Sequence, residues 1–211
     1  ALPIYTEQII AMMRTAQKNQ TKILVFPELA ITGYTCEDLF FQDRLLNEAL
    51  LQLKNIITAS KSLDMVTIVG LPYVFNHKLY NVAAVIYEGQ LLGLVPKTHI
   101  PNYSEFYEAR HFESGQEILT EVLFEDQIVP FGSHLLFENA QMPAMSIGVE
   151  ICEDLWAPNP PSSAHALAGA TIIANASASN ELTGKSDYRR LLVQSQSARL
   201  VTAYIYANAG V

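Results

Sequence analysis

One apolar segment that ends in a thiol and two carboxylates constrains this chain more than any other feature. Residues 146–151 have the composition of a buried strand, and Cys152 follows directly, with Glu153 and Asp154 after it. In α/β folds, reactive groups gather where strands end. We therefore interpret Cys152 as a nucleophile. The competing interpretation is an inert packed thiol, which is the commoner role of a buried cysteine.

Composition favours a globular protein and disfavours several kinds of partner. The 211 residues are 50% hydrophobic and 16% charged, which suits one domain with a large core. The net charge of -8 disfavours a nucleic-acid surface, and no apolar run approaches the ~20 residues that span a bilayer. Cys36 and Cys152 do not make a disulfide framework, although one bond between them stays open. We expect a cytoplasmic protein without a nucleic-acid or membrane partner.

Strand and helix patterns alternate along the chain. Apolar spacing predicts helices over 6–18 and 43–60, a short helix capped by Ser162 or Ser163, and a helix from the N-cap Ser186 to about 199. β-branched runs predict strands over 22–26, 65–69, 80–87, 91–95, 122–124, 127–131, 135–137, 146–151, 171–175 and 201–206. This alternation indicates a layered α/β fold, with residues 1–211 in one domain.

Glu28, Lys97 and Cys152 share one description, because each follows an apolar strand. Strand ends that meet at one sheet edge would bring the three side chains together. A thiol that hydrolyses an amide needs a base for its proton and a cation to favour anionic forms. Taken singly, each residue also has a plainer interpretation: a solvated loop glutamate, a solvated capping lysine and a packed thiol.

Three motifs around these residues resemble those of the nitrilase, or carbon–nitrogen hydrolase, superfamily. The motifs are residues 26–28, 96–97 and 152–156, and the resemblance covers essentially the whole chain. It implies a four-layer α-β-β-α sandwich. It also implies that Glu28 is the general base, Lys97 the cation that stabilises an oxyanion, and Cys152 the nucleophile. Glu108 matches the second glutamate of the family, which orients the lysine and the substrate.

Further segments resemble the glutaminase domain of glutamine-dependent NAD synthetases. This resemblance implies that L-glutamine is hydrolysed through a cysteine thioester, and that the ammonia passes to a synthetase domain that amidates deamido-NAD. It also implies a homo-oligomer that pairs through helices, and an oxyanion contact from the backbone N–H of Glu153. The segments are 33–34, 101–112, 150–156, 188–191 and 204–208. The residues that match glutamine-binding positions are Tyr103, Phe106, Glu153, Ser179 and Lys185.

The chain lacks segments that this family would supply. The family's first strand and the residues that complete the domain after Val211 are absent, so we expect a chain that is incomplete at both ends. A Ser-Gly-Gly-x-Asp-Ser phosphate loop and a P-loop are also absent from the sequence. We therefore expect no cofactor here, and assign ATP and Mg²⁺ to a synthetase domain elsewhere on the same polypeptide.

Other functions stay open. A stand-alone amidase or nitrilase acting on another small amide or nitrile would share the same three residues, and a catalytically silent oligomerisation or regulatory domain would share the fold. A Cys–His enzyme is disfavoured because Cys152 lacks the flanking glycines of a nucleophile elbow. A metal site formed by Glu150, Cys152, Glu153 and Asp154 is disfavoured because adjacent strand residues point to opposite faces. We expect no metal.

Overall fold

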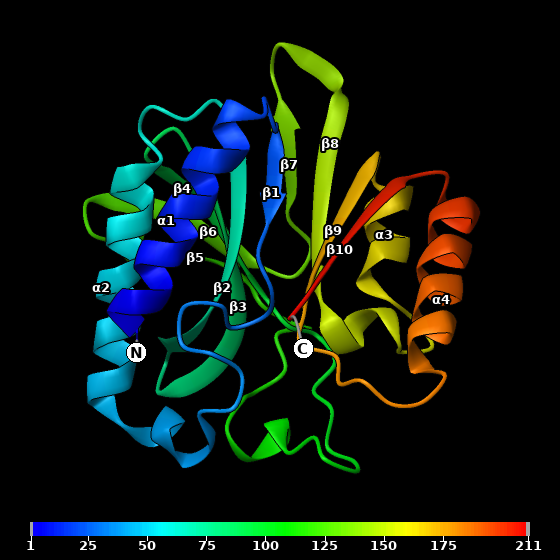
Figure 1. Cartoon of the computed structure of the whole chain (residues 1–211), viewed down its shortest axis with the longest axis horizontal. Helices are drawn as coiled ribbons and strands as arrows, with labels where there is room; N and C mark the ends of the chain where they lie inside the picture. Colours follow the sequence, from blue (N-terminus) through cyan, green and yellow to red (C-terminus); the bar gives the residue numbers. More distant parts are fainter. Residues whose placement is uncertain (1, 210–211) are drawn as a thin grey trace.

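A computed structural model describes residues 2–209, which form two β-sheets between two pairs of helices. Helices α1 (Leu2–Lys18) and α2 (Asp43–Ala59) cover the outer face of one sheet, and α3 (Pro161–Leu167) and α4 (Lys185–Leu200) cover the other (Figure 1). The predicted α-β-β-α sandwich is therefore confirmed. Within this span, every helix falls short of the length or hydropathy that a membrane crossing requires.

The larger sheet has the strand order β1-β2-β3-β4-β6-β5. Strand β1 runs parallel to β2, and β2, β3 and β4 form an antiparallel meander. Strand β6 runs parallel to β4 and forms a hairpin with β5. The strands are β1 (Ile23–Val25), β2 (Val66–Phe75), β3 (Lys78–Tyr87), β4 (Gln90–Pro96), β5 (Leu119–Phe124) and β6 (Gln127–Gly132).

The smaller sheet has the order β10-β9-β8-β7, and its strands are β7 (Leu136–Asn139), β8 (Met142–Ile151), β9 (Ile172–Ser177) and β10 (Ala203–Asn208). Strands β8, β9 and β10 are parallel, so their carboxyl ends lie at one edge of the sheet. Ile151 is in register with Ala176. The residues that follow, Cys152 and Ser177, consequently lie side by side.

Successive side chains of the central strands point to opposite faces of the larger sheet, so one hydrophobic core forms on each side of it. In β2, Ile68 packs between the two sheets, while the next residue, Val69, packs under the helices. In β3, Val85 and Ile86 divide in the same way. Burial on both faces explains why these strands read as continuous apolar runs. Each such side chain contributes about 1.5–3 kcal/mol through burial.

The predicted caps of the short third helix are wrong. Neither Ser162 nor Ser163 occupies the N-cap, because the helix begins at Pro161 and has Pro160 as its N-cap. Proline suits the first helical turn because its missing N–H needs no partner there. The backbone N–H of Ser162 donates 2.8 Å to a carboxylate oxygen of Glu150, so the cap comes from a distant strand.

The predicted ends of the last helix are also displaced. Gly184 holds the N-cap position with φ 81°, so α4 begins at Lys185, one residue before Ser186. Glycine enters this left-handed region without a steric cost. At the other end Val201 has φ 55° and serves as the C-cap, so the last strand begins two residues later than predicted.

Candidate active site

The ends of β1 and β4 bring two predicted site residues into direct contact. Glu28 lies three residues after β1 and Lys97 directly after β4. The ammonium of Lys97 is fully buried and lies 2.6 Å from Glu28 Oε1 and 2.6 Å from Glu108 Oε1. Both carboxylates are buried as well. One cation therefore sits between two carboxylates, as the predicted roles of these residues require.

The pKa values of this cluster follow from burial and mutual charge. Burial alone would lower the pKa of Lys97, but the charges of Glu28 and Glu108 outweigh it and hold the pKa well above its ordinary value. Burial raises the pKa of Glu28, and the attraction of Lys97 offsets this only in part. A carboxylate with a raised pKa binds a proton more readily, which suits the predicted role of Glu28 as a general base.

Two further residues hold the cluster, and sequence reasoning assigned neither to the site. Asn81 in β3 donates from Nδ2 to Glu28 Oε1 at 2.7 Å and to Glu108 Oε2 at 3.4 Å. The hydroxyl of Tyr34 donates to Glu108 Oε1 at 2.8 Å. The available signal was Asn81 itself, since a buried amide inside an apolar strand needs a polar partner.

Cys152 opens the 3-10 helix η3 (Cys152–Leu155) with φ 44°, a left-handed backbone conformation. This conformation costs a non-glycine residue roughly 1–2 kcal/mol, and such strain is concentrated at functional sites. The backbone N–H of Cys152 donates to Asn175 Oδ1 at 2.9 Å, which holds the turn in place. The chain therefore turns sharply at the predicted nucleophile, without flanking glycines.

The sulfur of Cys152 lies close to the Glu28 carboxylate. The hydroxyl of Ser177 donates to Sγ at 3.2 Å, and the next backbone N–H, from Ala178, donates to Glu28 Oε2 at 3.1 Å. Burial and the negative charge of Glu28 raise the pKa of the thiol, and Lys97 opposes this rise. A raised pKa favours the protonated thiol, so the predicted role of nucleophile would require a base that takes the proton.

A cavity of about 350 Å³ opens beside Cys152. All five residues predicted to hold glutamine line it, and they are Tyr103, Phe106, Glu153, Ser179 and Lys185. The Tyr103 hydroxyl donates to both carboxylate oxygens of Glu153 at 3.0 Å. The ammonium of Lys185 lies 5.5 Å from the ring centre of Phe106 and 5.1 Å from that of Trp156. The wall thus presents a carboxylate, an ammonium and aromatic rings.

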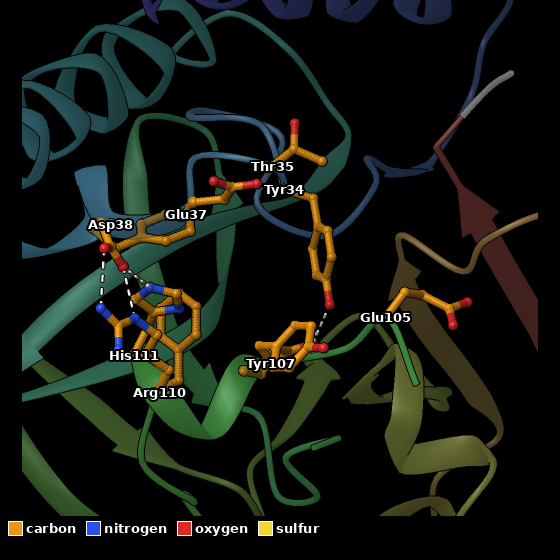
Figure 2. Close-up of a pocket in the computed structure, with 11 residues that line it drawn as sticks. Tyr34, Thr35, Glu37, Asp38, Glu105, Tyr107, Arg110 and His111 are labelled. Carbon is orange, nitrogen blue, oxygen red and sulfur yellow. Dashed lines mark hydrogen bonds and ion pairs between the residues drawn. The ribbon is translucent and has the colours of Figure 1, made fainter. Parts of the chain in front are cut away.

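A second hollow has a volume of about 300 Å³, and Figure 2 shows residues that line it. Tyr34 lines it, and Asp38 pairs there with Arg110 at 2.7 Å and with His111 at 3.3 Å. Of the predicted site residues, only Glu108 lines it. This hollow is therefore separate from the cavity that contains the thiol.

Asp154 ties the Cys152 turn to the segment after Lys97. Its buried carboxylate accepts the backbone N–H groups of Ile151 at 2.9 Å, Thr98 at 3.1 Å and His99 at 2.7 Å. Two loops from different sheets therefore share one acceptor, which fixes the position of the thiol relative to the ammonium.

Replacing Asp154 by asparagine is expected to lower the free energy of unfolding by about 1–3 kcal/mol, because an amide NH₂ would face backbone donors in a buried site. Urea unfolding measures the loss. Asp126→Asn, at an exposed turn, is the matched control and should change the free energy of unfolding by less than about 0.5 kcal/mol. Equal effects of the two substitutions would contradict the tying role of Asp154.

The described residues offer neither a disulfide nor an evident metal site. Cys36 and Cys152 are both free thiols, so the bond left open between them is not formed. Between residues 2 and 209, no group of three or more His, Cys, Asp or Glu side chains is arranged to hold a metal ion.

Comparison with known proteins assigns the chain to a family. Residues 5–209 match the family model described as carbon–nitrogen hydrolase. The chain belongs to the carbon–nitrogen hydrolase family. The resemblance inferred from three short motifs thus extends over nearly the whole sequence, and the α-β-β-α architecture is the one expected for a carbon–nitrogen hydrolase.

Similar members of the carbon–nitrogen hydrolase family are parts of longer proteins. A glutamine-dependent NAD(+) synthetase of Mycobacterium tuberculosis is 42% identical over 202 residues, which is 96% of this chain and 30% of that protein. The structure of a glutamine-dependent NAD(+) synthetase from Cytophaga hutchinsonii superimposes with a TM-score of 0.86 at 33% identity, over 97% of this chain and 33% of that one. The chain thus spans about a third of these relatives.

A more distant solved structure supports the fold alone. An amidase from Nesterenkonia sp. AN1 superimposes with a TM-score of 0.74 at 15% identity, over 99% of this chain and 73% of that one. The two-sheet sandwich is therefore shared with an amidase whose sequence has diverged widely.

Proposed function

We propose that this chain is the glutaminase domain of a glutamine-dependent NAD(+) synthetase, and that it hydrolyses L-glutamine at Cys152. The observation that carries the proposal is the cavity beside the thiol, because every residue expected to hold glutamine lines it. The names and identities of the relatives support the same function. The proposal includes a synthetase domain on the same polypeptide, which would bind ATP and Mg²⁺, and a cytoplasmic homo-oligomer.

In the proposed reaction, Glu28 takes the proton of the Cys152 thiol, and the sulfur attacks the side-chain amide carbon of glutamine. The new S–C bond places a negative charge on the amide oxygen. The ammonium of Lys97 and the backbone N–H of Glu153 stabilise that oxyanion. Glu108 keeps the ammonium in position through its 2.6 Å contact with Lys97.

The C–N bond then breaks, and protonated Glu28 returns its proton to the nitrogen, which leaves as ammonia. The product on the enzyme is a thioester between glutamate and Cys152. Glu28 next takes a proton from water, whose oxygen attacks the thioester carbon. The S–C bond breaks, glutamate leaves, and the sulfur regains a proton from Glu28.

The charged groups of the cavity suit the two ends of an amino acid. In this proposal the ammonium of Lys185 meets the α-carboxylate and the carboxylate of Glu153 meets the α-ammonium, and both residues line the cavity. Tyr103 fixes that carboxylate through its hydroxyl. Phe106 packs against the aliphatic part of the substrate in this proposal. A short aliphatic amide has neither an α-carboxylate nor an α-ammonium to meet these two groups, which explains the proposed preference for glutamine.

Labelling with a glutamine-mimicking diazo ketone tests the proposal. We expect the reagent to modify Cys152 and not Cys36, glutamine to protect the thiol, and Cys152→Ala to lose both labelling and turnover. Mass spectrometry of the peptides identifies the site. Hydrolysis of short aliphatic amides but not of glutamine would favour a stand-alone amidase. Absence of both labelling and turnover would favour a silent oligomerisation domain.

A further inference from the structure

A pair of hydroxyl groups contacts the reactive sulfur from the side of β9 and β10. Ser177 is fully buried at the end of β9, with Oγ 3.2 Å from Cys152 Sγ and 2.6 Å from the hydroxyl of Tyr206 in β10. The backbone N–H of Ser179 donates to the same Ser177 Oγ at 3.2 Å. Three different segments thus converge on one serine hydroxyl, and none of these contacts has a part in the steps above.

The hydrogen-bonding capacity of a serine hydroxyl fixes the direction of these contacts. A hydroxyl has one hydrogen to donate and two lone pairs that accept. Ser179 N–H occupies one lone pair. When the sulfur is ionised it can only accept, so the single hydrogen of Ser177 points to Sγ. The remaining lone pair then accepts the hydroxyl proton of Tyr206.

We propose that Ser177 is a further catalytic residue, which donates a hydrogen bond to the Cys152 thiolate, and that Tyr206 is a positioning residue that fixes the direction of this donation. The inference deepens the function proposed above, since it rests on Cys152 as the nucleophile. Charge-assisted bonds of this kind are about twice as strong as neutral ones.

The charged groups around the sulfur explain why such a donor is needed. Glu28 opposes formation of the thiolate, and Lys97 favours it. Lys97, however, is already hydrogen-bonded to two carboxylates, so its charge is largely compensated. In the same cavity Glu153 adds a further carboxylate, Lys185 an ammonium and Tyr103 a neutral phenol. The neutral hydroxyl of Ser177 can donate to the thiolate while Lys97 keeps its hydrogen bonds to both carboxylates.

Tyr206 keeps its proton throughout the pH range in which Cys152 would react. Burial and the neighbouring sulfur raise the pKa of Tyr206 to about 12. Parallel pairing of β10 with β9 places Tyr206 in register with Asn175, the residue that accepts the backbone N–H of Cys152. The same pair of strands therefore fixes both the backbone and the sulfur of the nucleophile.

Two substitutions remove one hydroxyl each and test the inference. In the intact protein, Ser177→Ala is expected to slow alkylation of Cys152 by iodoacetamide about tenfold at neutral pH and to move the midpoint of its pH profile upward. Tyr206→Phe should also slow alkylation and raise the midpoint of the pH profile, but by less than Ser177→Ala does. Peptide mass spectrometry separates Cys152 from Cys36, and glutamine turnover is measured in parallel.

Matched controls separate this effect from simple loss of a buried hydroxyl. Ser146 is a buried serine in β8 whose hydroxyl has no hydrogen bond within residues 2–209, and Tyr73 is a buried tyrosine of the other sheet. Ser146→Ala and Tyr73→Phe should leave the alkylation profile unchanged. If the pH profile of alkylation is unchanged in Ser177→Ala while the parent hydrolyses glutamine, the inference about Ser177 is overturned and the proposed function stands. A shifted profile without glutamine turnover in the parent overturns the proposed function and keeps the inference.

Discussion

Replacing Lys97 by methionine is expected to abolish glutamine turnover and to make folding stability depend steeply on pH. The substitution leaves Glu28 and Glu108 buried beside each other without the cation that lies 2.6 Å from both. Removing one partner of a buried ion pair costs about 3–5 kcal/mol, because the remaining charge is uncompensated. Turnover is lost with the ammonium because no other side-chain cation contacts Glu28 within the described residues.

The direction of the pH dependence follows from the pKa of the Glu28 carboxyl group. Without Lys97, burial and the nearby charge of Glu108 hold the pKa of Glu28 in the folded state above the unfolded value of about 4.3. The folded variant then binds more protons than the unfolded chain, so its stability falls as the pH rises above that value. In the parent, Lys97 has a raised pKa, and its contribution is present below about pH 10.4 and is lost only above it.

Urea unfolding at pH 5 and pH 8 measures this difference, and Lys54→Met is the matched control. Lys54 pairs with Glu125 at 2.9 Å on the surface, where an ion pair contributes about 0–1 kcal/mol. We expect the Lys97 variant to lose far more stability than the control at pH 8 and to regain part of it at pH 5. Equal stability of the variant at the two pH values would mean that the buried carboxylate of Glu28 does not need Lys97 to stabilise its charge.

The order of strands and helices was predictable because burial on both faces leaves a strong pattern. Strands such as β2 and β3 are apolar over nearly their whole length, so composition alone marks them. The ends of helices were less predictable, because they depend on distant partners. The first turn of α3 is capped by Glu150, a residue of β8 that no local pattern connects with it.

Some residues of the candidate site were likewise predictable from the sequence, and others were not. Glu28, Lys97 and Cys152 were predicted because each interrupts the chain directly after an apolar run, and the structure places Lys97 against Glu28. Ser177 and Tyr206 were missed because their contacts arise from the pairing of β9 with β10, and a pattern within one strand carries no information on its neighbour. Their roles, like those of the first three, remain proposals that the variants above test.

Gly70 in β2 provides the second large expected effect, because it lies where the loop carrying Glu28 crosses the sheet. A Cβ at this position would lie 2.3 Å from the backbone nitrogen of Leu29 and 3.1 Å from the carbonyl carbon of Glu28. Leu29 already has φ 51°, so the loop has little freedom to move aside. Gly70→Ala is expected to destabilise the fold by about 1–3 kcal/mol through overpacking, and to reduce glutamine turnover by displacing Glu28 from Lys97.

Gly93→Ala, in β4 of the same sheet, is the matched control for this substitution. A Cβ there would approach the ring of Phe137 at 2.9 Å and a methyl group of Leu135 at 3.2 Å, and these side-chain ends can rotate away. The control should therefore lose less stability and keep its turnover. Urea unfolding and initial rates of glutamine hydrolysis measure both variants. Of the two glycines, Gly70 lies against the Glu28 loop and Gly93 does not. Comparable losses of turnover in the two variants would therefore show that crowding of the sheet, rather than displacement of Glu28, is responsible.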